Sequence, residues 1–292
     1  MDIEVRDLHK SFGTKEVLKG LSFTARGGEA FGLLGRNGAG KTTTIRIMMG
    51  VFPSDGGTVL ADGQPIDYRK VGFGYLPEER GLYPKREITE QLVYFARLKG
   101  LTRDAAAREV ARWLDRLEMG EYAKKKLEVL SKGNQQKIQL ITAVAHDPDV
   151  IILDEPFSGL DPVNAMLLKD VVREEIDRGK AVIFSSHQMS YVEEFCHSVC
   201  ILNGGVAAVS GNLMEIKRAQ RASKLRVRGE CAGQLADMFG GTAQEDCVIL
   251  NYDSEDGRLE LMKAAARLGA DEISVVEPTL NDIFVAATSE GV

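Results

Sequence analysis

Two patterns of apolar residues alternate along this chain. Short, mainly apolar runs occur at 30–34, 150–153 and 181–185, and runs of this length are typical of strands buried in a parallel sheet. Residues 3–8 and 17–25 instead alternate apolar with polar positions, which predicts half-buried strands. Because helix-periodic segments lie between these strands, the chain is predicted to have an α/β fold.

Residues 85–145 carry helical periodicity and are predicted to form an inserted helical lobe. One helix in this lobe is marked by apolar residues spaced four, three, one and three apart, which therefore share one face: Ala106, Val110, Trp113, Leu114 and Leu117. These residues are interpreted as core rather than as a binding surface.

A second, smaller domain is predicted from about residue 212, so that the two domains span 1–211 and 212–292. Its pattern is that of a small α/β domain, with strands at 225–228, 247–250 and 273–276 and helices at 234–239 and 257–268. The basic stretch is interpreted as a solvated linker and edge strand, the alternative being a contact with lipid headgroups or a partner. Its residues are Arg218, Arg221, Lys224, Arg226 and Arg228.

The run 30–34 leads into a glycine-rich loop and then into a helix-periodic segment. This order is that of a phosphate-binding P-loop, formed here by Gly35, Arg36, Asn37, Gly38, Ala39, Gly40, Lys41, Thr42 and Thr43. Glycines let the backbone adopt left-handed conformations and bring N–H groups against phosphate oxygens. Lys41 is predicted to contact the β- and γ-phosphates and the Thr42 hydroxyl to ligate Mg²⁺, so the loop predicts nucleoside triphosphate binding.

Two acidic residues follow the apolar run 150–153. Acids at the carboxyl end of a buried parallel strand lie in the crevice where an α/β sheet binds its ligand. Asp154 is predicted to hold Mg²⁺, and Glu155 to polarise the attacking water. The run 181–185 delivers Ser186 and His187 to the same crevice.

The chain resembles the ATP-binding subunits of ABC transporters over about its first two-thirds. The resemblance rests on five motifs that occur in the family's order and spacing, at 35–43, 130–136, 154–155, 158–161 and 186–187. It implies a P-loop NTPase cassette in which the opening strands form a small antiparallel sheet beside the parallel-sheet core. Residues 74–84 and 277–284 are similar to those of export-class subunits with a C-terminal accessory domain, some of which extrude sodium ions or drugs.

This resemblance implies roles for individual residues. His187 matches the family's switch histidine, which bonds the γ-phosphate and braces the water that Glu155 polarises. Phe12 matches the aromatic residue that stacks on adenine, the alternative being a Phe buried in the core. Ser131 and Gly133 match signature residues that donate to the γ-phosphate of a nucleotide held by the opposite subunit, and Ser131 is also a candidate N-cap.

The chain departs from the family at three positions. Glu78 replaces the Gln of the Q-loop, and its carboxylate can ligate Mg²⁺ although it would repel a γ-phosphate at close range. Lys132 and Asn134 replace the usual Gly and Gln of the signature, which leaves the phosphate donors in place. The predicted Mg²⁺ ligands are thus Thr42, Asp154 and Glu78.

Composition restricts the partners that this chain can have. Its 37 basic and 43 acidic residues give a net charge of −6, the wrong sign for a protein that mainly binds nucleic acid, so no nucleic-acid partner is expected. No apolar run approaches the roughly 18 residues needed to span a bilayer, and the first residues lack a signal peptide's apolar core. The chain is therefore expected to be cytoplasmic.

The cysteines form no C-x-x-C pair and are expected to be reduced structural thiols: Cys196, Cys200, Cys231 and Cys247. Cys196, His197 and Cys200 are close in sequence. We interpret them as one side of a helix that runs into a strand at 199–202 rather than as a metal site.

These features predict an ATPase subunit that uses ATP and Mg²⁺ and dimerises head to tail with a second, identical ATP-binding subunit. It is expected to drive a separate transmembrane permease from the cytoplasmic face of the cell membrane, in the export of ions or small molecules such as sodium or drugs. The resemblance places the permease contact on the helical lobe near 81–90. The alternative is a soluble ABC ATPase acting on DNA or ribosomes, whose paired cassettes, zinc inserts or coiled-coil arms are not visible in this sequence.

Overall fold

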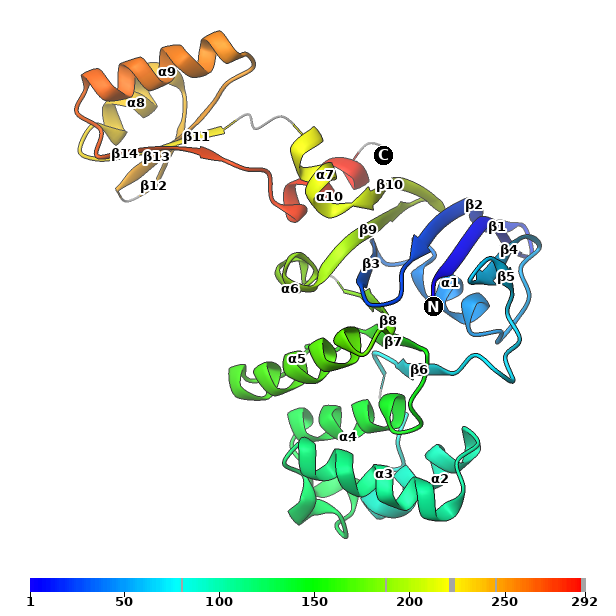
Figure 1. Cartoon of the computed structure of the whole chain (residues 1–292). Helices are drawn as coiled ribbons and strands as arrows, with labels where there is room; N and C mark the ends of the chain where they lie inside the picture. Colours follow the sequence, from blue (N-terminus) through cyan, green and yellow to red (C-terminus); the bar gives the residue numbers. More distant parts are fainter. Residues whose placement is uncertain (80, 187, 221–223, 245, 290–292) are drawn as a thin grey trace. The chain divides into compact units, whose positions relative to one another are not determined.

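The computed structural model describes residues 1–292 except 80, 187, 221–223, 245 and 290–292. It contains two compact units (Figure 1). Unit 1 comprises Met1–Leu213 together with the C-terminal stretch from Ala286, and unit 2 comprises Met214–Val285. The sequence pattern predicts a boundary at 211/212 with the whole C-terminus in the second domain, whereas the compact units divide after Leu213 and again after Val285.

Unit 1 is built around a six-stranded sheet with the strand order β10-β9-β3-β8-β7-β6. Its strands are β3 (Ala30–Gly35), β6 (Phe73–Leu76), β7 (Val150–Asp154), β8 (Ala181–Ser185), β9 (Cys196–Asn203) and β10 (Val206–Asn212). All neighbouring strands are parallel except the pair β9 and β10. β7 and β8 are buried throughout, as the apolar runs predicted, and the carboxyl ends of β3, β8, β7 and β6 meet at one edge.

A four-stranded antiparallel sheet lies beside this core, with the order β2-β1-β4-β5. Its strands are β1 (Ile3–Phe12), β2 (Lys15–Ala25), β4 (Gly56–Ala61) and β5 (Gln64–Pro65). Leu8 of β1, Leu33 of β3 and Ile45 of the first helix belong to one buried cluster, so the two sheets share a core. The predicted parallel-sheet core with a small antiparallel sheet is confirmed.

Three helices form the lobe in the lower part of Figure 1. They are α2 (Ile88–Leu98), α3 (Arg103–Arg116) and α4 (Lys132–Val144), connected between α3 and α4 by the short 3₁₀ turns η1 (Gly120–Tyr122) and η2 (Leu127–Val129). The predicted apolar face of α3 is buried, and Thr102 caps the helix by accepting a hydrogen bond from the Ala105 N–H at 3.3 Å.

The remaining helices of unit 1 are α1 (Lys41–Met48), α5 (Pro162–Asp177) and α6 (Met189–Phe195), while α7 (Leu213–Ala219) and α10 (Leu280–Ser289) each extend across the division between the units. None of the described helices is both long and apolar enough to cross a lipid bilayer.

Unit 2 has the element order βαββαβ, and both of its long helices pack on one face of a four-stranded antiparallel sheet. The elements are β11 (Lys224–Arg228), α8 (Ala232–Phe239), β12 (Thr242–Gln244), β13 (Cys247–Asn251), α9 (Glu255–Arg267) and β14 (Glu272–Val276). The strand order is β12-β13-β11-β14. Leu225 and Val227 of β11 pack with Leu235 of α8 and Leu261 of α9 in the core.

Two local expectations were wrong. The basic strand β11 is central rather than an edge strand, because it pairs with β13 on one side and with β14 on the other. Its Lys and Arg side chains lie on the face opposite Leu225 and Val227. Cys196 and His197 lie in β9 rather than in a helix, because α6 ends at Phe195. All four cysteines are buried, as expected of structural thiols.

Candidate active site

The loop between β3 and α1 has the backbone geometry of a phosphate-binding loop. Gly35, Gly38 and Gly40 have φ angles of 154°, 82° and 114°, which favour glycine. A Cβ atom on Gly35 would lie 2.8 Å from the carbonyl oxygen of Leu202, and one on Gly40 would lie 2.7 Å from Cδ2 of Leu18. Both positions therefore exclude a side chain, whereas at Gly38 only the backbone conformation calls for glycine.

The N-terminus of α1 is open to an anion. Its N-cap, Gly40, makes no side-chain cap, and its first turn contains no acidic residue. Because the first N–H groups of a helix have no partner within it, they and the helix dipole favour phosphate. The other predicted loop residues lie around this terminus: Asn37 and Thr42 are exposed, Thr43 is half-buried and Ala39 is buried.

Lys41 connects this loop to the acidic residues of two neighbouring strands. Its ammonium donates to the carbonyl oxygen of Gly35 at 2.7 Å. Burial lowers the pKa of Lys41, and the carboxylates of Asp154, Glu155 and Glu78 act against that effect. The carboxylates of Asp154, Glu155 and Glu78, at the ends of β7 and β6, therefore lie within electrostatic reach of the Lys41 ammonium, which follows β3.

Asp154 ends β7 as a buried carboxyl group. Burial raises its pKa, and the neighbouring carboxylates of Glu78 and Glu155 raise it further. A divalent cation would relieve this concentration of negative charge, so the residues fit Mg²⁺. One carboxylate and the Thr42 hydroxyl would be enough protein ligands for the ion, because Mg²⁺ usually takes its remaining ligands from phosphates and water.

Glu155 is held in an uncommon backbone conformation. Its φ angle is +50°, in the left-handed region that non-glycine residues rarely adopt and that is enriched at functional sites. Its N–H donates to the carbonyl oxygen of Ser185 at 2.8 Å, and its Oε2 accepts from Oγ of Ser186 at 3.0 Å. The segment at the end of β8 therefore orients the carboxylate predicted to be the general base.

Two supporting residues were missed in the sequence. Tyr75 of β6 donates from Oη to Oδ2 of Asp154 at 3.4 Å, and burial raises its pKa to about 12, so it remains a donor at neutral pH. Buried Gln139 of α4 donates from Nε2 to the carbonyl oxygens of Pro77 and Glu79, each at 3.1 Å. Tyr75 could have been noticed in the strand that leads to the Q-loop, but no sequence signal marks Gln139.

Ser131 and Gly133 form the start of α4. Ser131 is the N-cap, since its Oγ accepts from the Asn134 N–H at 3.2 Å. A Cβ atom on Gly133 would lie 3.4 Å from Nδ2 of Asn164 and 3.5 Å from Cδ2 of Leu160. This turn therefore packs closely against the segment that follows β7. The predicted contact of these residues with a nucleotide on the opposite subunit stays a prediction.

Phe12 is 51% exposed, so it is not the buried core residue of the alternative interpretation. Its ring meets Phe52 edge-on with centroids 5.7 Å apart, and Nζ of Lys10 lies 5.6 Å from its centroid. An exposed, laterally supported ring can stack on a base. The predicted catalytic residue His187 lies outside the described residues.

Comparisons with known proteins agree with this geometry. The family model described as "ABC transporter" matches residues 18–158. An uncharacterised ABC transporter ATP-binding protein, YhaQ, of Bacillus subtilis (strain 168) is 43% identical over 282 residues, covering 94% of this chain and 95% of its own. The Nod factor export ATP-binding protein I of Burkholderia lata is 36% identical over 213 residues, covering 72% and 70%.

A solved structure titled "Structure of ATP binding subunit of ABC transporter" is 30% identical, with a TM-score of 0.68 over 75% of this chain and 93% of that one. Its cassette fold is the one described above for unit 1. ATP binding and hydrolysis are the general activity of proteins with this cassette. The chain therefore belongs to the ABC transporter family, as an ATP-binding subunit.

Proposed function

We propose that this chain hydrolyses ATP to power a separate membrane permease in export. The observation that carries the proposal is that four groups of functional residues meet where the parallel strands end, at one edge of the sheet. The P-loop follows β3 and Ser186 follows β8, while Asp154 ends β7, Glu155 follows it and Glu78 follows β6. This order supports our assignment of phosphate donors, a metal-binding carboxylate and a general base to one site.

In the proposed reaction each residue acts on a different part of the nucleotide. The N–H groups of the P-loop and Lys41 would hold the phosphates, and Thr42, Asp154 and Glu78 would hold Mg²⁺. When bound, the cation would supply positive charge beside the phosphates. Glu155, oriented by Ser186, accepts the proton of the attacking water. His187 would complete this group at the γ-phosphate.

The proposed assembly contains two copies of the cassette. Ser131 and Gly133 start a helix whose N-terminal N–H groups suit a phosphate, and the first turn of α4 contains no acidic residue. We assign these donors to the nucleotide held by the opposite copy. Each site would then be complete only in the dimer, and hydrolysis would depend on dimerisation.

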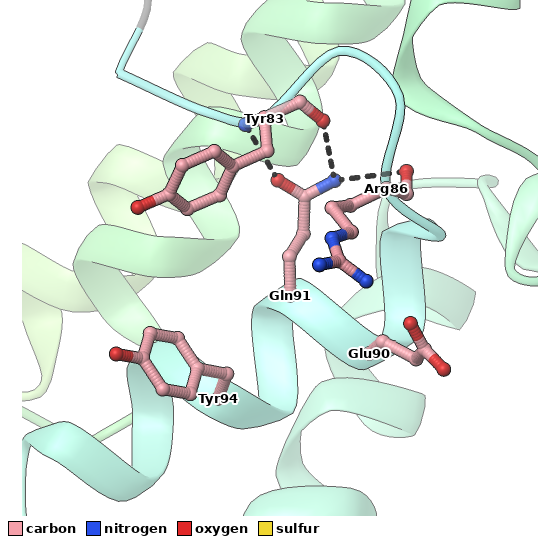
Figure 2. A pocket seen from close by; sticks show the side chains of 5 residues that line it. All are labelled: Tyr83, Arg86, Glu90, Gln91 and Tyr94. Carbon is pink, nitrogen blue, oxygen red and sulfur yellow. Dashed lines mark hydrogen bonds between the residues drawn. The ribbon is translucent and has the colours of Figure 1, made fainter.

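The helical lobe carries a groove that suits the permease. The groove measures about 460 Å³ and lies between α2 and the segment before it, within the region expected to contact the permease (Figure 2). Its lining residues are Tyr83, Arg86, Glu90, Gln91 and Tyr94. Exposed Tyr residues beside charged groups are typical anchors of protein interfaces, since they present apolar area and a polar tip together.

The groove is held open by a buried amide. Gln91 accepts from the Tyr83 N–H at 3.1 Å and donates from Nε2 to the carbonyl oxygens of Tyr83 and Arg86, each at 3.4 Å (Figure 2). Phe95 supports both aromatic walls, with centroids 6.3 Å from Tyr83 and 5.6 Å from Tyr94. The surface is thus shaped before a partner arrives, which reduces the entropy cost of docking.

Export is supported by the relative named for Nod factor export, and the permease partner by membership of the transporter family. Location at the cytoplasmic face of the membrane follows if the permease is the anchor. The solute would be recognised by the permease rather than by this chain.

The test is recovery of the chain from its native membranes in mild detergent, followed by mass spectrometry of what accompanies it. A stoichiometric polytopic membrane protein is expected, and Tyr94→Lys should reduce its recovery. Val206→Lys, at an exposed position of β10, serves as the control. Recovery of only soluble or nucleic-acid partners would contradict the proposal.

A further inference from the structure

The two edges of the unit 2 sheet differ in length and chemistry. β12 forms one edge with three residues, of which two are polar. β14 forms the other edge with five residues, of which three are apolar, and among the described residues it pairs with β11 alone. An edge strand presents unpaired N–H and C=O groups that another strand can bond.

The apolar layer beneath the helices is incomplete at β14. Leu225 and Val227 of β11 and Val248 of β13 are fully buried on the helix side of the sheet. The residues of β14 on that side, opposite Leu225 and Val227 in the register, are Val275 and Ile273. Val275 is 38% exposed and Ile273 only partly buried, so the apolar row continues to the edge without cover.

β14 also has few of the features that keep edge strands from pairing, since its one charged residue is Glu272 at its start. It contains no Lys, Arg or Pro, and its register with β11 is unbroken from Glu272 to Val276. Proteins usually protect such an edge with an inward-pointing charge, a proline or a bulge. Here the first proline is Pro278, two residues beyond the strand, and it limits any added pairing to the length of β14.

The sequence of β14 is complementary to itself. In an antiparallel pair of two copies centred on Ser274, Ile273 of each copy lies opposite Val275 of the other. Glu272 lies opposite Val276, so the two carboxylates of the pair are not placed against each other. Both cross-strand apolar pairs fall on the helix side, where they would complete the row that is now open.

We propose that β14 of one chain pairs antiparallel with β14 of a second copy, centred on Ser274, and joins two unit 2 sheets into one of eight strands. The occupant is a second copy because the register satisfies both strands at once, as a twofold interface requires. The contact is small and therefore weak alone, and it rests on the proposed dimer of cassettes, which would bring two copies of the chain together. It goes beyond the proposed function and gives unit 2 a task separate from ATP binding.

The test is disulfide crosslinking of the full chain carrying Ser274→Cys, under copper phenanthroline and without nucleotide. Directly opposite residues of an antiparallel pair have Cβ atoms about 4.5–5.5 Å apart, so the introduced thiols can join after small adjustments. The native cysteines are all buried, so the parent chain should stay uncrosslinked. Glu272→Cys is the register control, since its two thiols would be offset by four residues, or about 14 Å along the strands at ~3.4 Å per residue.

A second pair of variants tests the apolar row. Val275→Lys in the Ser274→Cys background should slow crosslinking at least about tenfold, because a charge would be buried between the strands. Leu259→Lys on α9 is the matched control, because Leu259 is 43% exposed in the same unit and should leave the rate unchanged.

The pairing would be established by two results. Ser274→Cys gives a crosslinked dimer and Glu272→Cys does not, and the dimer is lost on adding Val275→Lys but not on adding Leu259→Lys. Equal crosslinking at both cysteine positions, no effect of Val275→Lys, or a crosslink to a different protein would overturn it. ATP hydrolysis is measured on the same samples. Intact hydrolysis without crosslinking would remove only this inference and leave the proposed function standing.

Discussion

The sheet at the centre of unit 1 and the sheet of unit 2 present their functional groups in different places. In unit 1, β3, β8, β7 and β6 are parallel neighbours, so the segments that follow them all lie at one edge. In unit 2 every neighbouring pair of strands is antiparallel, so the carboxyl ends of neighbouring strands point in opposite directions.

This difference explains why recognisable chemistry is confined to unit 1. A parallel sheet gathers groups from distant parts of the sequence around one ligand, which suits catalysis. An antiparallel sheet with helices on one face instead offers a second face and two edges, which suit association. Four experiments test this division.

The largest effect is expected at the base in unit 1. Glu155→Gln keeps the shape of the side chain but removes its basicity, and should lower ATP turnover by about 10² to 10⁴ while ATP binding persists. Steady-state hydrolysis and nucleotide binding measure the two effects. Glu175→Gln, a change at a buried carboxylate of α5, is the control. Hydrolysis at the parent rate would show that another group activates the water.

The next largest effect should be confined to unit 2. Leu225→Ala removes a fully buried side chain from its core and should destabilise this unit by about 2–5 kcal/mol. Amide hydrogen exchange in unit 2 peptides should accelerate, whereas ATP hydrolysis should not change because every predicted site residue lies in unit 1. Loss of hydrolysis would mean that the units are not separable in this way.

Phe12→Ala tests whether the antiparallel sheet of unit 1 contributes to nucleotide binding. Stacking of a base on an aromatic ring is worth about 1–3 kcal/mol, so KM for ATP should rise by about 5- to 150-fold. Phe12→Tyr should restore most of the affinity because it keeps the ring. Equal KM values for the alanine variant and the parent would remove Phe12 from the site.

The smallest effect is a shift in pH dependence. Asp154 must be ionised to hold Mg²⁺, so hydrolysis should fall as the pH drops through the raised pKa of this residue. Glu78→Gln removes one of the charges that raise this pKa, so the acid limb of the rate profile should move to lower pH. Glu79→Gln is the control, because Glu79 is not among the charges that act on Asp154. An unchanged profile and an unchanged rate would exclude Glu78 from the mechanism.

The strands of unit 1 could be predicted from the sequence more closely than those of unit 2. Strands β3, β7 and β8 were predicted closely because their burial on both faces leaves a local, almost wholly apolar signature. The place of β11 was not predicted, because Lys and Arg on one face are compatible with an edge strand or with a central strand in a half-open sheet. Periodicity reports which face is buried and not which strand is the neighbour.

The sequence alone determined the phosphate loop, the acidic pair after β7 and the N-cap of α4, because each depends on residue types at short spacing whose chemistry is local. Only the tertiary structure decided that Ser186 orients Glu155, that Gln139 holds the Q-loop backbone and that Phe12 is exposed. It alone decided that β14 is an edge strand in the sheet that the described residues form. These contacts join residues far apart in sequence, and chain folding, rather than local composition, selects which of them meet.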